Sequence, residues 1–178
     1  FGKALGGGFP VGAVGGSTKL MAGVDGGEWA YGDRSFPVSP RTYFAGTFCK
    51  HPLSMAAVSA VLEHVEEHAG SMYDQLDAGT ARLVSAVNEW WMAQQLQGMR
   101  AERFGSMFRF CVPADAAAVF HEALRCHGVH AVQGRACFLS TAHTASAIEF
   151  VIEAVKRTTT ALLENGIRLS APGEGGAG

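Results

Sequence analysis

A lysine close to a cluster of glycines is the first feature of this sequence that could do chemistry. Lys3 lies in the segment FGKALGGGFPVGA, residues 1–13, and is one of four lysines in the 178-residue chain. Most lysines are solvated surface charges. Here the glycines at positions 6–8 leave the backbone free to adopt positive φ and to approach a ligand closely. The pattern therefore favours a ligand-binding role for the segment around Lys3.

Two glycine-rich nucleotide-binding motifs do not fit the spacing. A Walker A motif places Lys-Ser or Lys-Thr after its last glycine, whereas Lys3 precedes the glycines. A dinucleotide fingerprint fails as well, because the spacing of Gly6, Gly8 and Gly12 is one residue too long and no predicted strand precedes it. Both nucleotide-binding interpretations are therefore set aside.

A second segment of interest is TYFAGTFCKHPLSMAA, residues 42–57. Gly46 and Thr47 stand here shortly before a predicted helix. Thr47 could simply end the loop before that helix, which is a common arrangement. Alternatively, a threonine hydroxyl and a backbone N–H near a helix start can bind a phosphate group. The residues alone leave both interpretations open.

The segment around Lys3 resembles the class III pyridoxal-phosphate-dependent aminotransferases related to glutamate semialdehyde aminomutase. In that family a Gly-Lys pair, a glycine-rich turn and Pro-Val-Gly-Ala carry the cofactor lysine. The resemblance implies pyridoxal 5'-phosphate (PLP) as the cofactor and Lys3 as the catalytic, Schiff-base-forming residue. A lysine amine suits this role because it can form an imine and, once released, move a proton between carbon atoms. It must be neutral part of the time, which a partly desolvated pocket favours.

The resemblance extends to about Asn165. It implies that Gly46 and Thr47 supply a backbone amide and a hydroxyl to the cofactor phosphate of the neighbouring subunit, and hence a homodimer with composite active sites. The segments 104–108 and 137–144 resemble the small domain of the family, where they build the fold. For His143 we expect a structural hydrogen bond rather than an acid or base role.

The sequence departs from the aminomutase pattern at one place, and this departure indicates a particular group within the family. Lys50 and His51 precede Pro-Leu where free-standing aminomutases usually have Gly-Asn. Together with YGDRSFP, residues 31–37, this version resembles aminotransferase domains embedded in hybrid polyketide and nonribosomal peptide synthases. It implies transfer of an amino group from glutamate or glutamine to a β-keto acyl chain bound to an acyl carrier protein. Two alternatives stay open, a free-standing glutamate-1-semialdehyde 2,1-aminomutase and a non-catalytic dimerisation or interaction module.

The implied architecture is an α/β protein of fold type I. Residues 1–50 would form the end of the large PLP-binding domain, and residues 51–166 the connecting helix and the small α/β domain. Residues 167–178, rich in glycine and alanine, are expected to form a flexible, linker-like tail. The remaining cofactor contacts of the family would lie upstream of Phe1. We therefore expect this chain to be the C-terminal part of a longer domain and to be inactive alone.

Hydrophobic periodicity and turn residues predict the secondary structure. Gly70 is expected to end one long helix, and a capping box at Ser71 and Asp74 to open the next. The predicted helices are 17–22, 53–68, 71 to about 98, 114–127 and 145–165, and the predicted strands are 108–112, 129–132 and 136–140.

Composition and charge exclude several other classes of function. The net charge is −2, with 14 basic and 16 acidic residues spread along the chain, so we expect no nucleic-acid or anionic-membrane partner. No apolar run reaches the length of a membrane helix, and the start lacks the layout of a signal peptide. The four cysteines show no CxxC pair. A cytoplasmic protein is predicted.

A short segment matches a metalloprotease motif but gives little support for a zinc site. The segment HVEEH, residues 64–68, has the H-x-x-E-H spacing that can place two imidazoles one helical turn apart. These residues fall on the polar side of the predicted helix, and no third ligand is evident. The looser cluster of Cys126, His127 and His130 is also interpreted as incidental, so no metal is expected.

Overall fold

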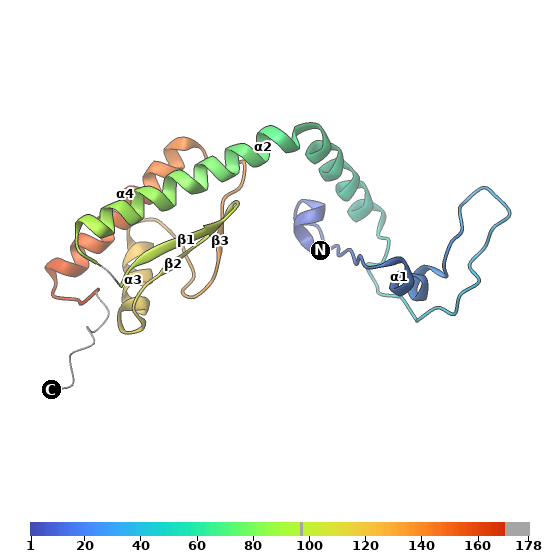
Figure 1. Cartoon of the computed structure of the whole chain (residues 1–178), viewed down its shortest axis with the longest axis horizontal. Coiled ribbons are helices and arrows are strands. Elements are labelled where there is room, and N and C mark those ends of the chain that lie inside the picture. Colours follow the sequence, from blue (N-terminus) through green and yellow to red (C-terminus); the bar gives the residue numbers. More distant parts are fainter. Residues whose placement is uncertain (97, 170–178) are drawn as a thin grey trace. The chain divides into compact units, whose positions relative to one another are not determined.

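A computed structural model describes residues 1–96 and 98–169, and the chain divides into two compact units. Unit 1 is Phe1–Ala69 and unit 2 is Gly70–Gly178. The boundary falls inside α2 (Pro52–Ala93), so each unit contains part of this helix. Figure 1 labels the elements along the chain. Within the described residues, no helix combines the length and the hydropathy that a membrane span requires.

Unit 1 consists of short elements joined by turns. It contains the 3-10 helix η1 (Lys3–Gly6), α1 (Thr18–Asp25) and the first part of α2. The helix predicted for residues 17–22 is confirmed, and it continues to Asp25, where Gly26 ends it with φ +93°. Few side chains are buried here, and several large apolar side chains are exposed: Phe1, Tyr31, Tyr43, Phe44 and Phe48. Apolar surface of this extent is typical of an interface.

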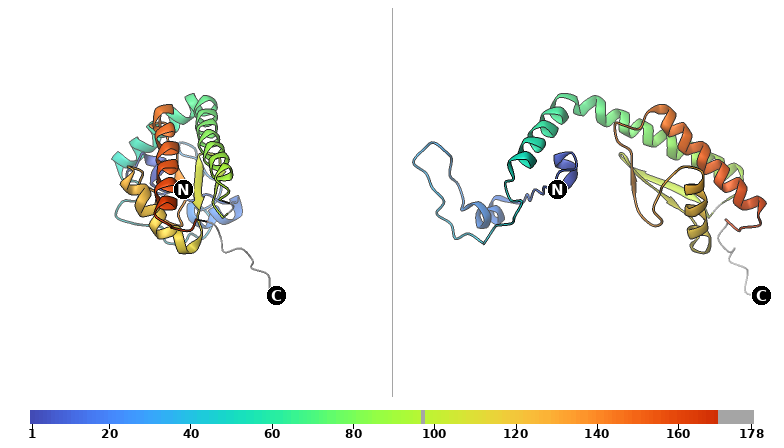
Figure 2. Two further views of the ribbon diagram at one scale, coloured as in Figure 1. Left: turned by 90° about the vertical axis from the view of Figure 1, so that its left-hand side faces the viewer. Right: turned by 180° about the vertical axis from the view of Figure 1, so that it is seen from behind.

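Unit 2 is an antiparallel sheet packed against helices. The strands β1 (Arg100–Phe104), β2 (Met107–Cys111) and β3 (Cys137–Phe138) follow one another in the sheet. The helices are α3 (Ala114–Cys126) and α4 (Ala145–Glu164). In Figure 1 and Figure 2 alike, α4 runs beside the part of α2 that belongs to this unit. Arg82 pairs with Glu149 and Trp91 with Thr159, so the two helices run in the same direction.

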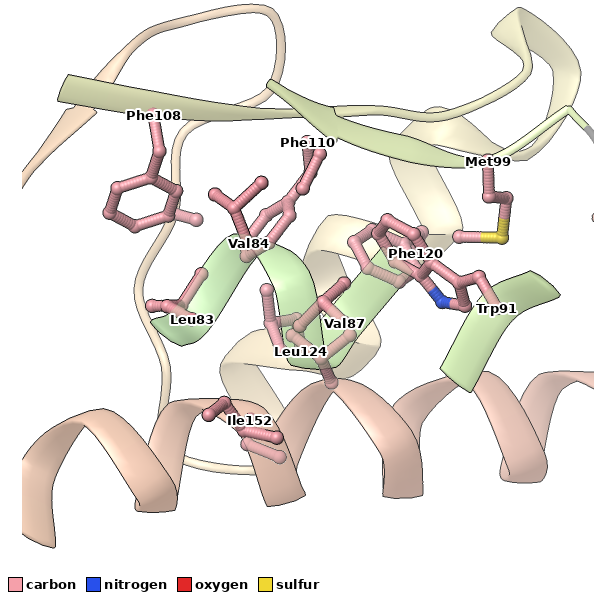
Figure 3. Packing of buried hydrophobic residues seen from close by; sticks show 14 of the residues in the cluster. Leu83, Val84, Val87, Trp91, Met99, Phe108, Phe110, Phe120, Leu124 and Ile152 are labelled. Atoms are coloured by element: carbon pink, nitrogen blue, oxygen red, sulfur yellow. The ribbon is translucent and has the colours of Figure 1, made fainter. Parts of the chain in front are cut away.

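The core of unit 2 is centred on Trp91 of α2, whose side chain is 1% exposed. Its ring meets Phe110 of β2 and Phe120 of α3 edge to face, at centroid distances of 6.0 and 6.2 Å. Its indole N–H donates a hydrogen bond of 3.1 Å to the Thr159 hydroxyl of α4, which satisfies the one polar atom of a buried tryptophan. Figure 3 shows side chains of β2, α2, α3 and α4 meeting in this cluster.

The β1–β2 hairpin carries an ionic cluster on its exposed face. Glu102 accepts hydrogen bonds from Arg100 of the same strand and Arg109 of the neighbouring strand, at 2.7 and 2.8 Å. These bonds lower the pKa of the Glu102 carboxyl to about 2. Gly105, with φ +54°, lies in the turn between the strands. β1 was not predicted from the sequence, because its residues are mostly charged and only Ala101 is buried.

Most predicted elements of unit 2 are present, with shifted bounds. The strand predicted for 108–112 is confirmed as β2, and the helices predicted for 114–127 and 145–165 as α3 and α4. The strand predicted for 136–140 shrinks to the two residues of β3. The strand predicted for 129–132 is wrong: the N–H of Val129 donates to Leu124 O, and with Gly128 at φ +87° this closes α3 rather than starting a sheet pairing.

The predicted helix break at Gly70 is also wrong. α2 runs without interruption through Gly70, so Ser71 and Asp74 form no capping box. A glycine inside a helix costs only about 1 kcal/mol relative to alanine, which is too little to end a helix flanked by good helix formers such as Glu67, Ala69 and Met72. At the other end, Leu169 is 1% exposed and belongs to the core, so the first residues of the segment predicted as a tail are packed. The rest of that segment, residues 170–178, lies outside the described residues.

The continuity of α2 can be tested at this glycine. Gly70→Ala should raise the free energy of unfolding by about 0.5–1 kcal/mol, because alanine loses less backbone entropy and its Cβ would meet nothing within 4 Å. Urea unfolding followed by circular dichroism measures the change. As a control, Gly105→Ala should destabilise the protein, because φ there is +54°. A Gly70→Ala variant that is less stable than the parent would contradict a continuous helix.

Candidate active site

Lys3 begins a tight turn that exposes its side chain. Lys3–Gly6 form the 3-10 helix η1, and Gly7 and Gly8 follow with φ of +61° and +100°. Their N–H groups donate to Ala4 O and Lys3 O, at 3.2 and 3.0 Å. The glycines therefore close the turn in a conformation that other residues adopt only with strain. Among the described residues Lys3 has no ion-pair partner, so its amine is open to a ligand.

The turn is held against the start of α2. Gly6 is buried, and a Cβ on it would lie 2.6 Å from Val11 Cγ1 and 3.6 Å from Val58 Cγ2 of α2. Ser54 of α2, fully buried, donates its hydroxyl to Pro10 O at 3.2 Å. The absence of a side chain at Gly6 and this one hydrogen bond together fix the position of the segment after Lys3.

Gly46 and Thr47 form a second turn in the same unit. The N–H of Cys49 donates to Gly46 O at 2.9 Å, and the N–H of His51 to Phe48 O at 3.2 Å. Within the described part of the chain, no acceptor pairs with the N–H groups of Thr47 and Phe48, and the Thr47 side chain is exposed. One hydroxyl and two unpaired amides make a donor set suited to a phosphate group.

These residues line a hollow of about 560 Å³ in unit 1. Its wall consists of Pro10, Val11 and Gly12 from the segment after the Lys3 turn, residues 44–50, and Met55 of α2. The structure thus brings Gly46 and Thr47 against the segment that follows Lys3. Lys3 itself does not line the hollow. Lys50 does line it, which its place in the sequence did not predict.

The histidines considered as acid, base or metal ligands in the sequence make local contacts within the fold. His143 Nδ1 accepts a hydrogen bond of 3.0 Å from the N–H of Ser140, so the expected structural role is confirmed. The rings of His64 and His68 stack at 4.4 Å, and His68 Nδ1 lies 2.9 Å from His64 O. Across residues 1–96 and 98–169, no three His, Cys, Asp or Glu side chains are grouped as metal ligands.

Two curated proteins with similar sequences carry the same name. The chain is 32% identical over 177 residues to glutamate-1-semialdehyde 2,1-aminomutase of Acidobacterium capsulatum, and 33% identical over 172 residues to the enzyme of the same name of Desulforapulum autotrophicum. The alignments cover 90% and 86% of this chain, but only 38% and 36% of those relatives. The chain therefore spans less than two fifths of their length. No family model matches it.

Two solved structures share the fold, a transaminase and a protein in its PLP internal aldimine form. An omega-transaminase from Sphaerobacter thermophilus superimposes with a TM-score of 0.71 at 26% identity, over 89% of this chain and 37% of that one. The PLP form of the Sphingopyxis sp. MTA144 FumI protein gives a TM-score of 0.59 at 23% identity, over 72% of this chain and 31% of that one, and supports the fold alone.

The fold is therefore that of the corresponding part of the fold type I, PLP-dependent transaminases. Within this class, the sequence relatives support a class III aminotransferase domain that is similar to part of glutamate-1-semialdehyde 2,1-aminomutase. The predictions of fold class and family are confirmed. The residues of the two turns fit the cofactor of this family, because they offer a primary amine for a carbonyl group and a set of hydrogen-bond donors for a phosphate.

Proposed function

We propose that this chain supplies Lys3 as the catalytic lysine of a PLP-dependent aminotransferase. The observation that carries the proposal is the turn at Lys3, an exposed amine followed by two glycines with positive φ and fixed against α2. The enzyme would transfer an amino group from glutamate or glutamine to a keto group of a β-keto acyl thioester held on an acyl carrier protein. Residues 1–50 would complete its large domain, and residues 51–166 would form the connecting helix and the small domain.

Each residue of the site has a defined task in this reaction. When bound, PLP supplies the carbonyl group and the electron-withdrawing ring that acidify the hydrogen on the carbon bearing the amino group. The Lys3 amine would hold the cofactor at rest and, once displaced by the substrate, take up and return the proton. Gly46 would offer a backbone amide and Thr47 a hydroxyl to the phosphate group.

The role of Lys3 is tested by trapping. The full protein containing this chain is incubated with PLP and reduced with borohydride, and its peptides are analysed by mass spectrometry. We expect a phosphopyridoxyl adduct on Lys3 and none in a Lys3→Ala variant. Lys19→Ala, which removes an exposed lysine of α1, serves as the matched control and should leave the adduct on Lys3 unchanged. A folded protein that carries no adduct would support the non-catalytic module instead.

We further propose that Gly46 and Thr47 serve the cofactor of a partner subunit in a homodimer. Two observations support this arrangement. Lys3 lies outside the hollow that Gly46 and Thr47 line, and unit 1 exposes large apolar side chains such as Phe44 and Phe48, which a second subunit could cover.

A mixed dimer tests the composite site. A Lys3→Ala subunit keeps Thr47, and a Thr47→Ala subunit keeps Lys3. If the site is composite, a dimer of the two contains one complete site, and its affinity for PLP should be about tenfold higher than that of the Thr47→Ala homodimer. Absorbance titration of the purified mixed dimer measures this affinity. An affinity equal to that of the Thr47→Ala homodimer would assign Thr47 to the cofactor of its own subunit.

Two substrate classes compete, and a different observation favours each. The Lys50-His51 pair and the segment 31–37 resemble the domains that act on carrier-bound chains. The names of the relatives favour isomerisation of glutamate-1-semialdehyde.

The two reactions are distinguished by assaying the full enzyme with both substrates. We expect amino transfer from glutamate or glutamine to a carrier-bound β-keto acyl thioester, detected as a mass change on the carrier protein, and no isomerisation of glutamate-1-semialdehyde. The Lys3→Ala variant is the control for both assays, because it should lose either activity by several orders of magnitude. Isomerisation without amino transfer to the thioester would identify an aminomutase.

A further inference from the structure

Lys50 gives the hollow beside Thr47 a positive charge. Its side chain is exposed and lines the hollow together with Gly46, Thr47 and Cys49. No acidic residue belongs to the wall, so Lys50 is the one formally charged residue there. Among the described residues it also has no ion-pair partner. Its ammonium group is therefore free to bind an anion.

The backbone of Lys50 adopts a conformation that favours a different residue. Its φ is +57°, and it is one of two non-glycine residues with positive φ among the described residues. The turn is held on both sides, since Cys49 N–H donates to Gly46 O and His51 N–H donates to Phe48 O. Glycine would adopt this φ without strain. The backbone conformation therefore does not explain why position 50 is a lysine. We infer that the side chain of Lys50 has a function that outweighs this strain.

The chemistry around Lys50 selects the kind of anion. The Thr47 hydroxyl and the unpaired N–H groups of Thr47 and Phe48 belong to the same turn. A lysine ammonium beside amide and hydroxyl donors is a common arrangement for binding phosphate. We propose that Lys50 binds a phosphate group in this hollow, as a phosphate contact additional to Gly46 and Thr47.

Two ligands could supply the phosphate group. Both follow from the proposed function, on which this step rests. One is the phosphate monoester of PLP. The other is the phosphodiester of the phosphopantetheine arm that carries an acyl chain on a carrier protein. Both present anionic oxygens to the same donors.

The phosphate site itself is tested without cofactor or substrate. Inorganic phosphate is titrated calorimetrically into the PLP-free full protein and into Lys50→Gln, Lys50→Gly and Lys50→Arg variants. Loss of the charge should weaken phosphate binding about tenfold in the first two, whereas Lys50→Arg should stay within about threefold of the parent. Lys19→Gln, which removes a charge outside the hollow, should have no effect. Equal affinity in Lys50→Gln and the parent would overturn the proposal and leave Lys50 as a solvated surface charge.

The Lys50→Gly variant distinguishes the effect of the side chain on phosphate binding from the effect of the backbone conformation on stability. Because glycine relieves the strain at φ +57°, this variant should melt about 2–4 °C higher than the parent while it binds phosphate more weakly. A variant that loses both stability and phosphate binding would mean that the turn had collapsed, and that result would contradict the assigned role of the side chain.

The source of the phosphate is then identified with matched ligands. If PLP is the source, Lys50→Gln should raise the Kd of PLP about tenfold and leave the Kd of pyridoxal, which lacks the phosphate, unchanged. If the carrier arm is the source, the variant should raise KM for the carrier-bound thioester but not for the same acyl group on N-acetylcysteamine. A variant that changes neither would overturn the proposal. Failure of the proposed function would give a different result. Lys3 of the unaltered protein would then form no phosphopyridoxyl adduct, but Lys50→Gln would still weaken the binding of inorganic phosphate.

Discussion

The close packing of a short loop against the first turns of α2 is the constraint on which the candidate site depends. Gly6 fits between Val11 and Val58 only because it has no Cβ, and the buried Ser54 hydroxyl holds Pro10 O. Unit 1 buries few other side chains, so these contacts replace the hydrophobic core that usually positions a site. Both the exposed amine of Lys3 and one wall of the hollow beside Thr47 follow from them.

The similarity to known proteins covers this chain but less than two fifths of the length of its relatives. The chain spans 38% of its aminomutase relative from Acidobacterium capsulatum, so the activity of a whole enzyme belongs to the proposal. The similarity therefore supports the family, whereas the substrate is part of the proposed function. The exposed apolar side chains of unit 1 agree with an interface with further protein surface, either from the same polypeptide or from a second copy.

Residue types and periodicity predicted the parts of this protein that depend on local sequence. The Lys3 motif and the helices α3 and α4 could be recognised, because their glycines and apolar spacing are visible in the sequence. β1 could not, because a strand with one buried side chain lacks an apolar alternation. The continuity of α2 through Gly70 was not predicted, because a glycine often marks the end of a helix, although its helix penalty is small and good helix formers flank this one on both sides. The position of Lys50 in the hollow depends on a positive φ, which the lysine gives no reason to expect.

The buried Gly6 also limits how this site can evolve. A side chain at position 6 would collide with Val11, so the loop after Lys3 has little freedom to vary without loss of its position. The turn at Gly46 and Lys50 is more permissive, since a Cβ on Gly46 would meet nothing within 4 Å. Changes in ligand preference during divergence are therefore expected to accumulate in the second turn, while the first turn stays fixed. Lys50 and His51 lie in this second turn, where such change is tolerated.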